Sequence, residues 1–380
     1  MDKTKKKQVL LMMNARKFLS VIVQYAAQHN WRLTLMNDGI APRGWKGDGA
    51  IVSFSRSESQ MRFIAKFAQT TTPVVGLSYA RPDIEIPRAI VDYSQNARIA
   101  AEHLHSKGYR HFVFCTSERI KSAEISYKVF VEHLRMLGVA DDIPWIVRAE
   151  TIRKGREDDW DENMRAFKSI VKLPKPLGIW CMSDSVAVNL LDCAIANSMS
   201  VPAEVGILGT NDNIIVCENQ DVTISSINPN FRNLAITACE MLDKMMESGE
   251  KENEFAYIPA LGVSERESTD GAFEKSPLLK EILQFMADNL SSSITVEEIA
   301  VKFSVSVSKL HRLFRAEMNT TPLAELRSLR FNKAKSLLRT TDFTLDYIAN
   351  ATGFLHPPHL VNAFRASVGL TPAEWRRLWK

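Results

Sequence analysis

Short apolar runs alternate with amphipathic segments through about the first 270 residues of this 380-residue chain. Apolar runs bounded by polar residues predict buried strands, and apolar positions three or four residues apart predict helices. The predicted strands span residues 9–13, 50–54, 74–77, 111–115, 177–182 and 205–208. The predicted helices span residues 21–29, 58–68, 95–107, 125–137, 165–171, 185–197 and 233–246. The alternation predicts an α/β fold with parallel sheets that carry helices on both faces.

The rest of the chain contains one pattern twice, at residues 294–326 and 343–375. Each copy predicts a short helix, a break containing Ser304 or Gly353, and a second helix that turns an apolar i, i+4 pair inward, which together make a helix-turn-helix. The alternative is a small helical bundle that only packs, but a bundle has no reason to repeat the turn. The matching residues are Ile299-Ala300, Leu310, Phe314-Arg315 and Thr321-Pro322 in the first copy, and Ile348-Ala349, Leu360, Phe364-Arg365 and Thr371-Pro372 in the second.

The offset between the copies rises from 49 to 50, so the second copy has one extra turn residue. Two such units in tandem can place two helices in successive major grooves of DNA.

Residues 272–380 hold 15 lysine and arginine against 10 aspartate and glutamate residues, whereas the whole chain has 48 against 44. Nearly all the basic excess therefore lies on the repeated segment, where DNA phosphates would need it.

The second helix of each copy supplies the candidate DNA-binding residues. In the first copy Ser306 is the expected N-cap, and Lys309 and Arg312 could reach guanine edges or phosphates. Val307 could contact a thymine methyl group, and Arg365 in the second copy is better suited to a phosphate. The complete set is Ser306, Val307, Ser308, Lys309, His311, Arg312 and Arg315 in the first copy, and His356, His359, Asn362 and Arg365 in the second.

Residues 275–378 resemble the DNA-binding region of the AraC/XylS family of transcription regulators. The resemblance rests on E-x-I-A with S-x-S-x-L-x-R-L-F in the first copy, R-x-x-x-A-x-x-L-L at 330–338, and Y-I-A-x-x-x-G-F with G-L-T-P-A-E-W-R in the second. Asn319-Thr320 stands where a glycine is usual, and residues 355–359 (Leu-His-Pro-Pro-His) replace mostly polar residues. The prolines are compatible with the first turn of a helix. We expect the second helix to contribute mostly backbone contacts.

Several polar residues directly follow or precede predicted elements of the first 270 residues. Ligands collect at the carboxyl ends of the strands in parallel sheets, so these residues are candidates for a polar binding site. Each could instead be a helix N-cap. The polar candidates for ligand binding are Asn14, Arg16, Asp92, Asp184, Asn211 and Asp212.

The same segment resembles the effector-binding domains of LacI/GalR-type repressors and periplasmic sugar-binding proteins. The resemblance rests on residues 91–114, 177–212, 224–246 and 264–270, and it extends to the xylose-operon regulators, which join this type of domain to a C-terminal AraC-type pair. It implies a type I periplasmic-binding-protein-like fold of two Rossmann-like subdomains. It also implies that Asp184 bonds sugar hydroxyls and that Asn211 replaces a usual aspartate, with Asp212 next to it. Phe18 and Trp45 could stack on a sugar or simply pack in the core.

These patterns predict an effector domain at residues 1–271, a linker at 272–278 and an all-α DNA-binding domain at 279–380. The helix-turn-helix units are expected at about 294–318 and 343–368.

The apolar run Val9–Met13 is too short for a signal peptide or a membrane span, which indicates a cytoplasmic protein without a membrane partner. Five widely spaced cysteines without a C-x-x-C motif predict reduced buried thiols, with neither a disulfide framework nor a metal site.

Enzyme motifs are absent from the sequence: it has no G-x-x-x-x-G-K-[ST], H-E-x-x-H or G-x-S-x-G, and Gly47-x-Gly49 precedes a strand. No cofactor is expected. The predicted function is a sugar-responsive regulator that binds promoter DNA as a homodimer and, as an activator, contacts RNA polymerase, with xylose or a similar sugar as effector. The alternatives are a sugar sensor that acts on DNA through a partner, a repressor for a different sugar, and a DNA-modifying enzyme.

Overall fold

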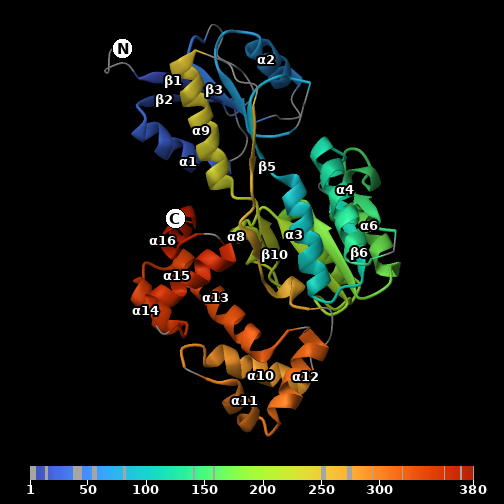
Figure 1. Ribbon diagram of the computed structural model, residues 1–380. Helices are drawn as coiled ribbons and strands as arrows, with labels where there is room; N and C mark the ends of the chain where they lie inside the picture. The colour runs from blue at the N-terminus through green and yellow to red at the C-terminus, as the bar shows by residue number, and fades with distance from the viewer. Residues whose placement is uncertain are drawn as a thin grey trace. The chain divides into compact units, whose positions relative to one another are not determined.

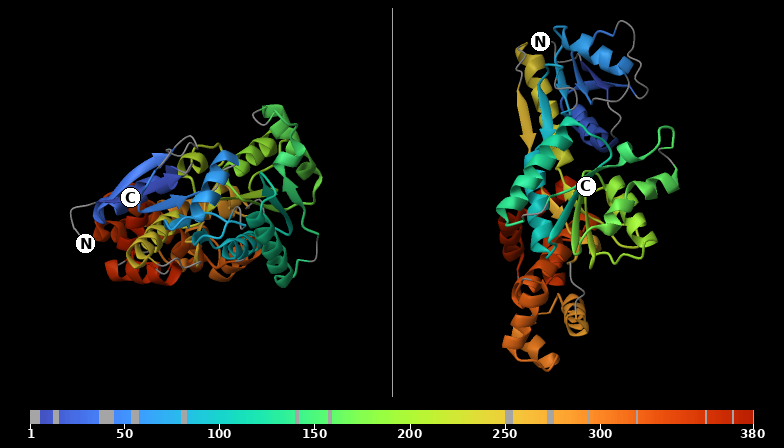
Figure 2. Two further views of the ribbon diagram at one scale, coloured as in Figure 1. Left: turned by 90° about the horizontal axis from the view of Figure 1, so that it is seen from above. Right: turned by 90° about the vertical axis from the view of Figure 1, so that its right-hand side faces the viewer.

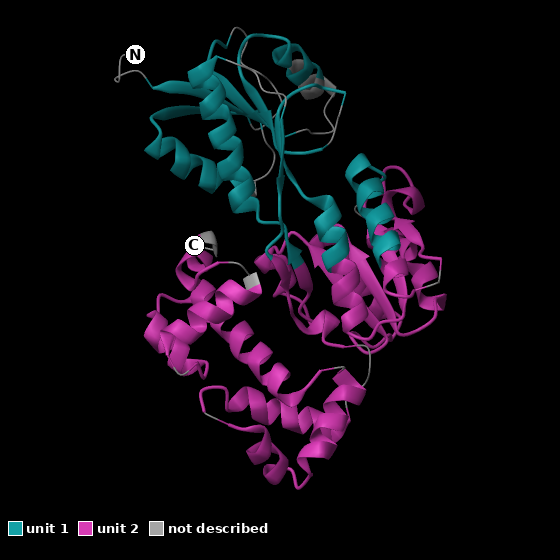
Figure 3. Cartoon of the chain, in the orientation of Figure 1, with its two compact units in different colours: residues 1–99, 118–133, 227–261 teal, residues 100–117, 134–226, 262–380 magenta. Residues whose placement is uncertain are grey.

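The computed structural model describes residues 6–12, 16–36, 45–53, 58–79, 83–139, 142–156, 159–249, 254–271, 276–292, 294–318, 320–354, 356–368 and 370–379. The chain forms two compact units (Figure 3). Unit 1 consists of residues 1–99, 118–133 and 227–261, and unit 2 of residues 100–117, 134–226 and 262–380. The two helices α3 (Tyr93–Ser106) and α4 (Lys121–Met136) each have residues in both ranges.

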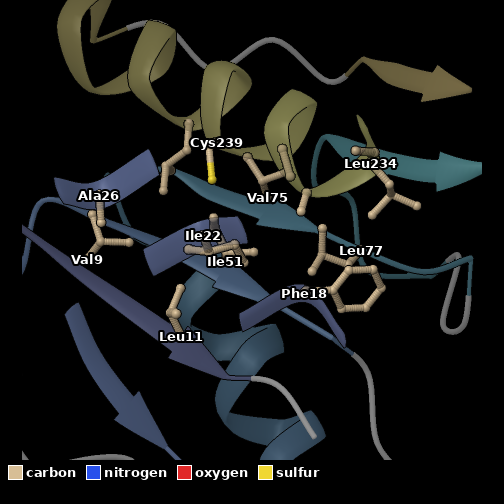
Figure 4. Close-up of a cluster of buried hydrophobic side chains, with 14 of the residues drawn as sticks. Val9, Leu11, Phe18, Ile22, Ala26, Ile51, Val75, Leu77, Leu234 and Cys239 are labelled. Atoms are coloured by element: carbon tan, nitrogen blue, oxygen red, sulfur yellow. The ribbon is translucent and has the colours of Figure 1, made fainter. Parts of the chain in front are cut away.

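Unit 1 is built on a six-stranded sheet in the order β11-β5-β4-β3-β1-β2, and its paired strands are parallel. The helices α1 (Arg16–Gln28) and α9 (Phe231–Ser248) pack on one face through a cluster that includes Val9 and Leu11 of β1 (Figure 4). Leu10 and Met12 of β1 point to the other face, where Ile64 packs with them. The strands are β1 (Lys7–Met12), β2 (Trp31–Met36), β3 (Gly49–Val52), β4 (Val74–Gly76), β5 (Arg88–Val91) and β11 (Phe255–Ile258), and α2 covers Glu58–Ala68.

Unit 2 contains the second six-stranded sheet, in the order β12-β10-β9-β8-β6-β7. Its central strands are almost wholly buried, which is why their sequences are continuous apolar runs. The strands are β6 (His111–Thr116), β7 (Trp145–Val147), β8 (Leu177–Cys181), β9 (Val205–Thr210), β10 (Ser225–Asn228) and β12 (Gly262–Ser264). The helical segments between them are α5 (Arg148–Thr151), α6 (Trp160–Ala166), η1 (Lys168–Lys172), α7 (Asp184–Ala196), α8 (Ile214–Cys217) and η2 (Glu267–Thr269).

The expected α/β fold with two parallel sheets is confirmed. The expected helix at 165–171 is wrong, because the Asp159 side chain accepts from the backbone N–H of Glu162 and starts α6 earlier. Phe167 then leaves the helical conformation, and a 3₁₀ turn follows. The cysteines of the described part of the chain are buried, as expected.

The C-terminal part of unit 2 is helical, and its repeated pattern does form two helix-turn-helix units (Figure 1). The helices are α10 (Pro277–Asp288), α11 (Val296–Lys302), α12 (Val307–Met318), α13 (Pro322–Thr340), α14 (Leu345–Ala351), α15 (Pro357–Val368) and α16 (Pro372–Trp379). The interval between the two helices of a copy is one residue longer in the second copy (α14 to α15) than in the first (α11 to α12), as the change in offset predicts. The inward pair of each copy, Leu310/Phe314 or Leu360/Phe364, is 0% exposed.

The helix α13 joins the two helix-turn-helix units, which lie at its opposite ends (Figures 1 and 2). Leu326 near the start of α13 packs in the core of the first helix-turn-helix. Farther along, the ring of Phe331 lies 4.7 Å from that of Phe364 in the second unit. A helix of 19 residues spans about 28 Å. One rigid element therefore positions both units.

The turns of both copies require a left-handed backbone conformation. Ser304 has φ 54° in the first copy, and Gly353 has φ 72° in the second. At Gly353 space is also limiting, since a Cβ there would lie 2.1 Å from the carbonyl oxygen of Leu290. The guanidinium of Arg330 on α13 bonds the same carbonyl at 3.1 Å. The turn of the second helix-turn-helix therefore packs against the chain just after α10, whose residues lie in the same apolar core as the first helix-turn-helix.

Gly353→Ala should lower the free energy of unfolding, measured with urea on the full chain. The left-handed backbone costs about 1 kcal/mol with a side chain present, and the crowded site adds about 1–3 kcal/mol. Gly249→Ala is the matched control, because Gly249 also has φ 72° but has nothing within 4 Å of an added Cβ. Equal losses in the two variants would contradict the close approach to Leu290.

Candidate functional site

The turn that follows β9 holds two adjacent residues in left-handed conformations. Asn211 has φ 112° and Asp212 has φ 49°. Such conformations in residues other than glycine are costly and persist where the surrounding structure holds them. The backbone N–H of Asp212 donates to Ser226 Oγ at 3.0 Å, and its carboxylate accepts from Ser264 Oγ at 2.7 Å. The segment 211–213 is called the β9 turn below.

Asp184, in the first turn of α7, holds the β9 turn through hydrogen bonds to its carboxylate. Its side chain is buried; one carboxylate oxygen accepts from Ser226 Oγ at 2.6 Å and the other from the backbone N–H of Asn213 at 2.8 Å. Ser183, rather than Asp184, is the N-cap of α7. Burial raises the pKa of Asp184 to about 6, against the opposite effect of these hydrogen bonds. Direct bonding of Asp184 to a sugar stays a prediction.

The side chains of the β9 turn differ in accessibility. Asp212 is buried, Asn211 is half-buried and Asn213 is exposed. The buried carboxylates of Asp184 and Asp212 therefore fix the turn, and the two asparagine side chains are the ones that it presents. An amide can both donate and accept hydrogen bonds, which suits a polyol.

The remaining sugar-site candidates belong to unit 1. The carboxylate of Asp92 accepts from the backbone N–H of Gln95 at 2.8 Å, so Asp92 caps α3, the alternative that the sequence leaves open. Phe18 is 4% exposed, and its ring lies edge-on to Phe231 at 5.3 Å, which favours core packing. The Trp45 ring packs 5.7 Å from Phe67. Asn14 and the side chain of Arg16 lie outside the described residues.

The segment Glu265–Asp270 was identified in the sequence only as part of a resemblance, but it is central to the site. Arg266 binds the Asp212 carboxylate at 2.9 Å, and its side chain is 8% exposed against 0% for Asp212. It also donates to the carbonyl of Ile224 at 3.0 Å. Ser268 bonds the carbonyl of Ile207 at 2.6 Å. The segment therefore fastens the chain to β9 and β10 just before the chain enters the helical region.

The candidate DNA-binding residues fall on one exposed face of each second helix. Ser306 caps α12, as predicted, by accepting from the backbone N–H of Lys309 at 3.1 Å. Val307 and His311 are half-buried, and the other candidates are exposed. At the offset of 50, Ser306, Lys309, Arg312 and Arg315 correspond to His356, His359, Asn362 and Arg365. Both faces point away from the buried Leu310/Phe314 and Leu360/Phe364 pairs.

Two family models match the chain in the expected order. Residues 101–269 match a periplasmic binding protein-like domain, and residues 299–378 match a helix-turn-helix domain. The chain thus has a periplasmic binding protein-like domain with two parallel sheets, followed by a helical domain with two helix-turn-helix units. A helix-turn-helix domain joined to such a domain is typical of DNA-binding transcription regulators. None of the helices in the described part of the chain is both long and apolar enough to cross a membrane.

Two of the relatives match this chain over nearly its whole length. The chain is 22% identical to the xylose operon regulatory protein of Escherichia coli K12, over 98% of this chain and 97% of that protein. It resembles the solved structure of a xylose-binding transcription activator with a TM-score of 0.60 and 21% identity, over 99% of both chains. A periplasmic binding protein/LacI regulator from Alkaliphilus metalliredigens complexed with D-xylulofuranose matches 69% of this chain and 99% of its own, with a TM-score of 0.55 and 23% identity. The resemblance expected from the sequence is confirmed.

Asp184→Asn should remove a pH-dependent part of the stability. Because the folded pKa of about 6 lies above the ordinary aspartate value of 3.8, this group stabilises the fold fully below pH about 4, and the contribution is lost as the pH rises through 6. On going from pH 7.5 to pH 4.5, the free energy of unfolding should therefore rise by about 2 kcal/mol more in the wild type than in the variant. Urea titrations at both pH values measure it. The exposed Asp221→Asn serves as control, and a difference that is constant with pH would contradict the assignment.

Proposed function

We propose that this protein activates transcription of a sugar catabolism operon in response to a pentose, with D-xylose as the first candidate. The observation that carries the DNA-binding part is the pair of equivalent exposed faces on α12 and α15. They occupy the same positions of a repeated unit, and α13 joins them. The sequence-derived limits of the effector domain (1–271), linker (272–278) and DNA-binding domain (279–380) form part of this proposal.

The two faces have different chemistry, which supports different roles on DNA. Lys309, Arg312 and Arg315 give the first face three cations, whereas the second carries only Arg365 beside two histidines and an asparagine. Long cationic side chains at the start and middle of a recognition helix can bind guanine edges. We infer that α12 reads bases and that α15 mainly fixes the position of the protein on the phosphate backbone.

The sugar assignment is supported by the β9 turn and by the relatives. Asn211 is half-buried at the carboxyl end of a parallel strand, the place where such sheets bind ligands. The relatives include a xylose operon regulatory protein and a xylose-binding transcription activator. A homodimer in the cytoplasm that binds promoter DNA and contacts RNA polymerase completes the proposal.

Lys309→Ala and Arg312→Ala should each cost about 1–3 kcal/mol on the preferred duplex and relax the preference at particular base pairs. Arg365→Ala should weaken binding to all sequences alike and lower the slope of log K against log salt by about one. Fluorescence anisotropy on a selected duplex and on a random duplex, at several salt concentrations, separates the two effects. Equal losses on both duplexes for all three variants would exclude α12 as the reading helix.

D-xylose at 100 times its dissociation constant should stabilise the effector domain by about 2.7 kcal/mol in a thermal-shift assay. Asn211→Gly should weaken sugar binding by about tenfold, because it removes one hydrogen-bonding side chain while glycine tolerates the left-handed backbone. The exposed Asn219→Gly is the matched control and should bind normally. A shift with another sugar but not with D-xylose would make the protein a regulator for that sugar.

A further inference from the structure

The β9 turn is connected to the helix that joins the two DNA-binding units through a chain of ionic contacts within unit 2. Arg266, which holds Asp212 of the turn, also donates to the Glu218 carboxylate at 3.2 Å. The same oxygen of Glu218 accepts from Arg339 in the last turn of α13. Two charge-assisted hydrogen bonds to one carboxylate oxygen of Glu218 thus connect Arg266, which holds the β9 turn, to α13.

These contacts belong to a larger charged surface along α13. Lys335 lies one helical turn before Arg339 and is opposite Glu265. Burial alone would raise the pKa of Glu265, but the charges of Lys107, His103 and Lys335 hold it below its ordinary value. Glu265 also binds Lys107 directly at 2.7 Å. Positions 335 and 339 share one face of the helix, so α13 presents a cationic edge to acidic groups of the sheet region.

The interface between α13 and the sheet region is not filled by close packing. A cavity of about 180 Å³ lies there, lined by Glu218, Glu265, Arg266, Lys335, Arg339 and Trp375 among others. Most of these groups are charged. Ionic contacts across a cavity can be exchanged without breaking an apolar core, so this contact is suited to two alternative arrangements.

A shift of α13 would reach both DNA-binding units. Leu326 belongs to the core of the first unit, and the ring of Phe331 lies 4.7 Å from that of Phe364. The Lys335 ammonium lies 5.3 Å from the ring of Trp375 on α16. The helix that receives the ionic contacts therefore packs on elements of both copies.

We propose that Arg266, Glu218 and Arg339 form a relay that transmits occupancy of the β9 turn to α13 and so to the DNA-binding helices. The relay rests on the proposed sugar response and specifies its route. A ligand that moves the β9 turn displaces Asp212 and, with it, Arg266. The hydrogen bond from Arg266 to Glu218 then strengthens or weakens. The hydrogen bond between Glu218 and Arg339 strengthens or weakens in turn, and α13 is held more or less firmly against the sheet region. None of these residues needs to touch sugar or DNA.

The test uses the full chain and compares Glu218→Gln and Arg339→Gln with two charge-matched controls, Asp221→Asn and Lys333→Gln. Asp221 lies three residues from Glu218, and Lys333 lies on α13; both are exposed. The measured quantity is the ratio of dissociation constants for a selected duplex without and with saturating D-xylose. The D-xylose thermal shift and the affinity for a random duplex are recorded on the same samples.

The wild type should show a ratio of about 5 to 150, or its inverse, the range of typical coupling between sites. Glu218→Gln and Arg339→Gln should bring the ratio close to one, whereas the thermal shift and the affinity for random DNA stay unchanged. The two controls should keep the wild-type ratio. The relay is wrong if both test variants keep that ratio, or if the controls lose it as well.

If D-xylose gives no thermal shift, the proposed sugar is contradicted but the relay is not. A second measurement then tests the relay without sugar. Hydrogen exchange of the amides at 322–340 is then compared among sugar-free proteins. Faster exchange in Glu218→Gln and Arg339→Gln than in Asp221→Asn and Lys333→Gln supports the relay. Equal exchange in all four variants overturns it.

Discussion

The buried ion pair between Arg266 and Asp212 is the contact on which the arrangement of unit 2 depends. Both side chains are almost fully removed from water, so each charge requires the other. The pair fixes the strained β9 turn on one side and the Glu265–Asp270 segment on the other. Removal of Arg266 would take this guanidinium away from the buried Asp212 carboxylate, whereas without Asp212 the Arg266 side chain would still bind Glu218. The same contact therefore holds the β9 turn and the chain segment that leads to the helical region.

The sequence predicted the sheets, the helical repeat and its turns because these depend on local periodicity. Buried central strands such as β8 and β9 appear as uninterrupted apolar runs, and the repeated Leu310/Phe314 and Leu360/Phe364 pairs mark the inward faces of their helices. Strand β2 was missed because polar Arg32 and Thr34 interrupt it at the edge of its sheet. Strand β5 begins with Arg88, an arginine that is fully buried because backbone carbonyls of residues 78 and 84 accept its guanidinium hydrogens at 2.7 Å.

The candidate ligand residues were harder to predict, because side chains at strand ends can serve as ligands, caps or supports. Asp184 and Asp212 have suitable positions in the sequence, but the structure uses their carboxylates to hold neighbouring backbone and side-chain groups. Arg266, Glu218 and Arg339 are 48 to 121 positions apart along the chain in their pairwise contacts, so no local pattern could bring them together. The signal in the sequence was the Glu-Arg-Glu-Ser-Thr-Asp segment at residues 265–270, which was identified there only as part of a resemblance.

The unequal charge of the two exposed helix faces gives the DNA-binding region a direction. A protein with two identical faces could lie on a duplex in either orientation with nearly equal energy. Here the cation-rich face of α12 and the sparsely charged face of α15 are held at fixed positions by α13. One orientation should therefore be preferred at any asymmetric site, which sets on which side of the protein the promoter continues. The polarity of transcription control would then be encoded in the difference between two copies of one repeated unit.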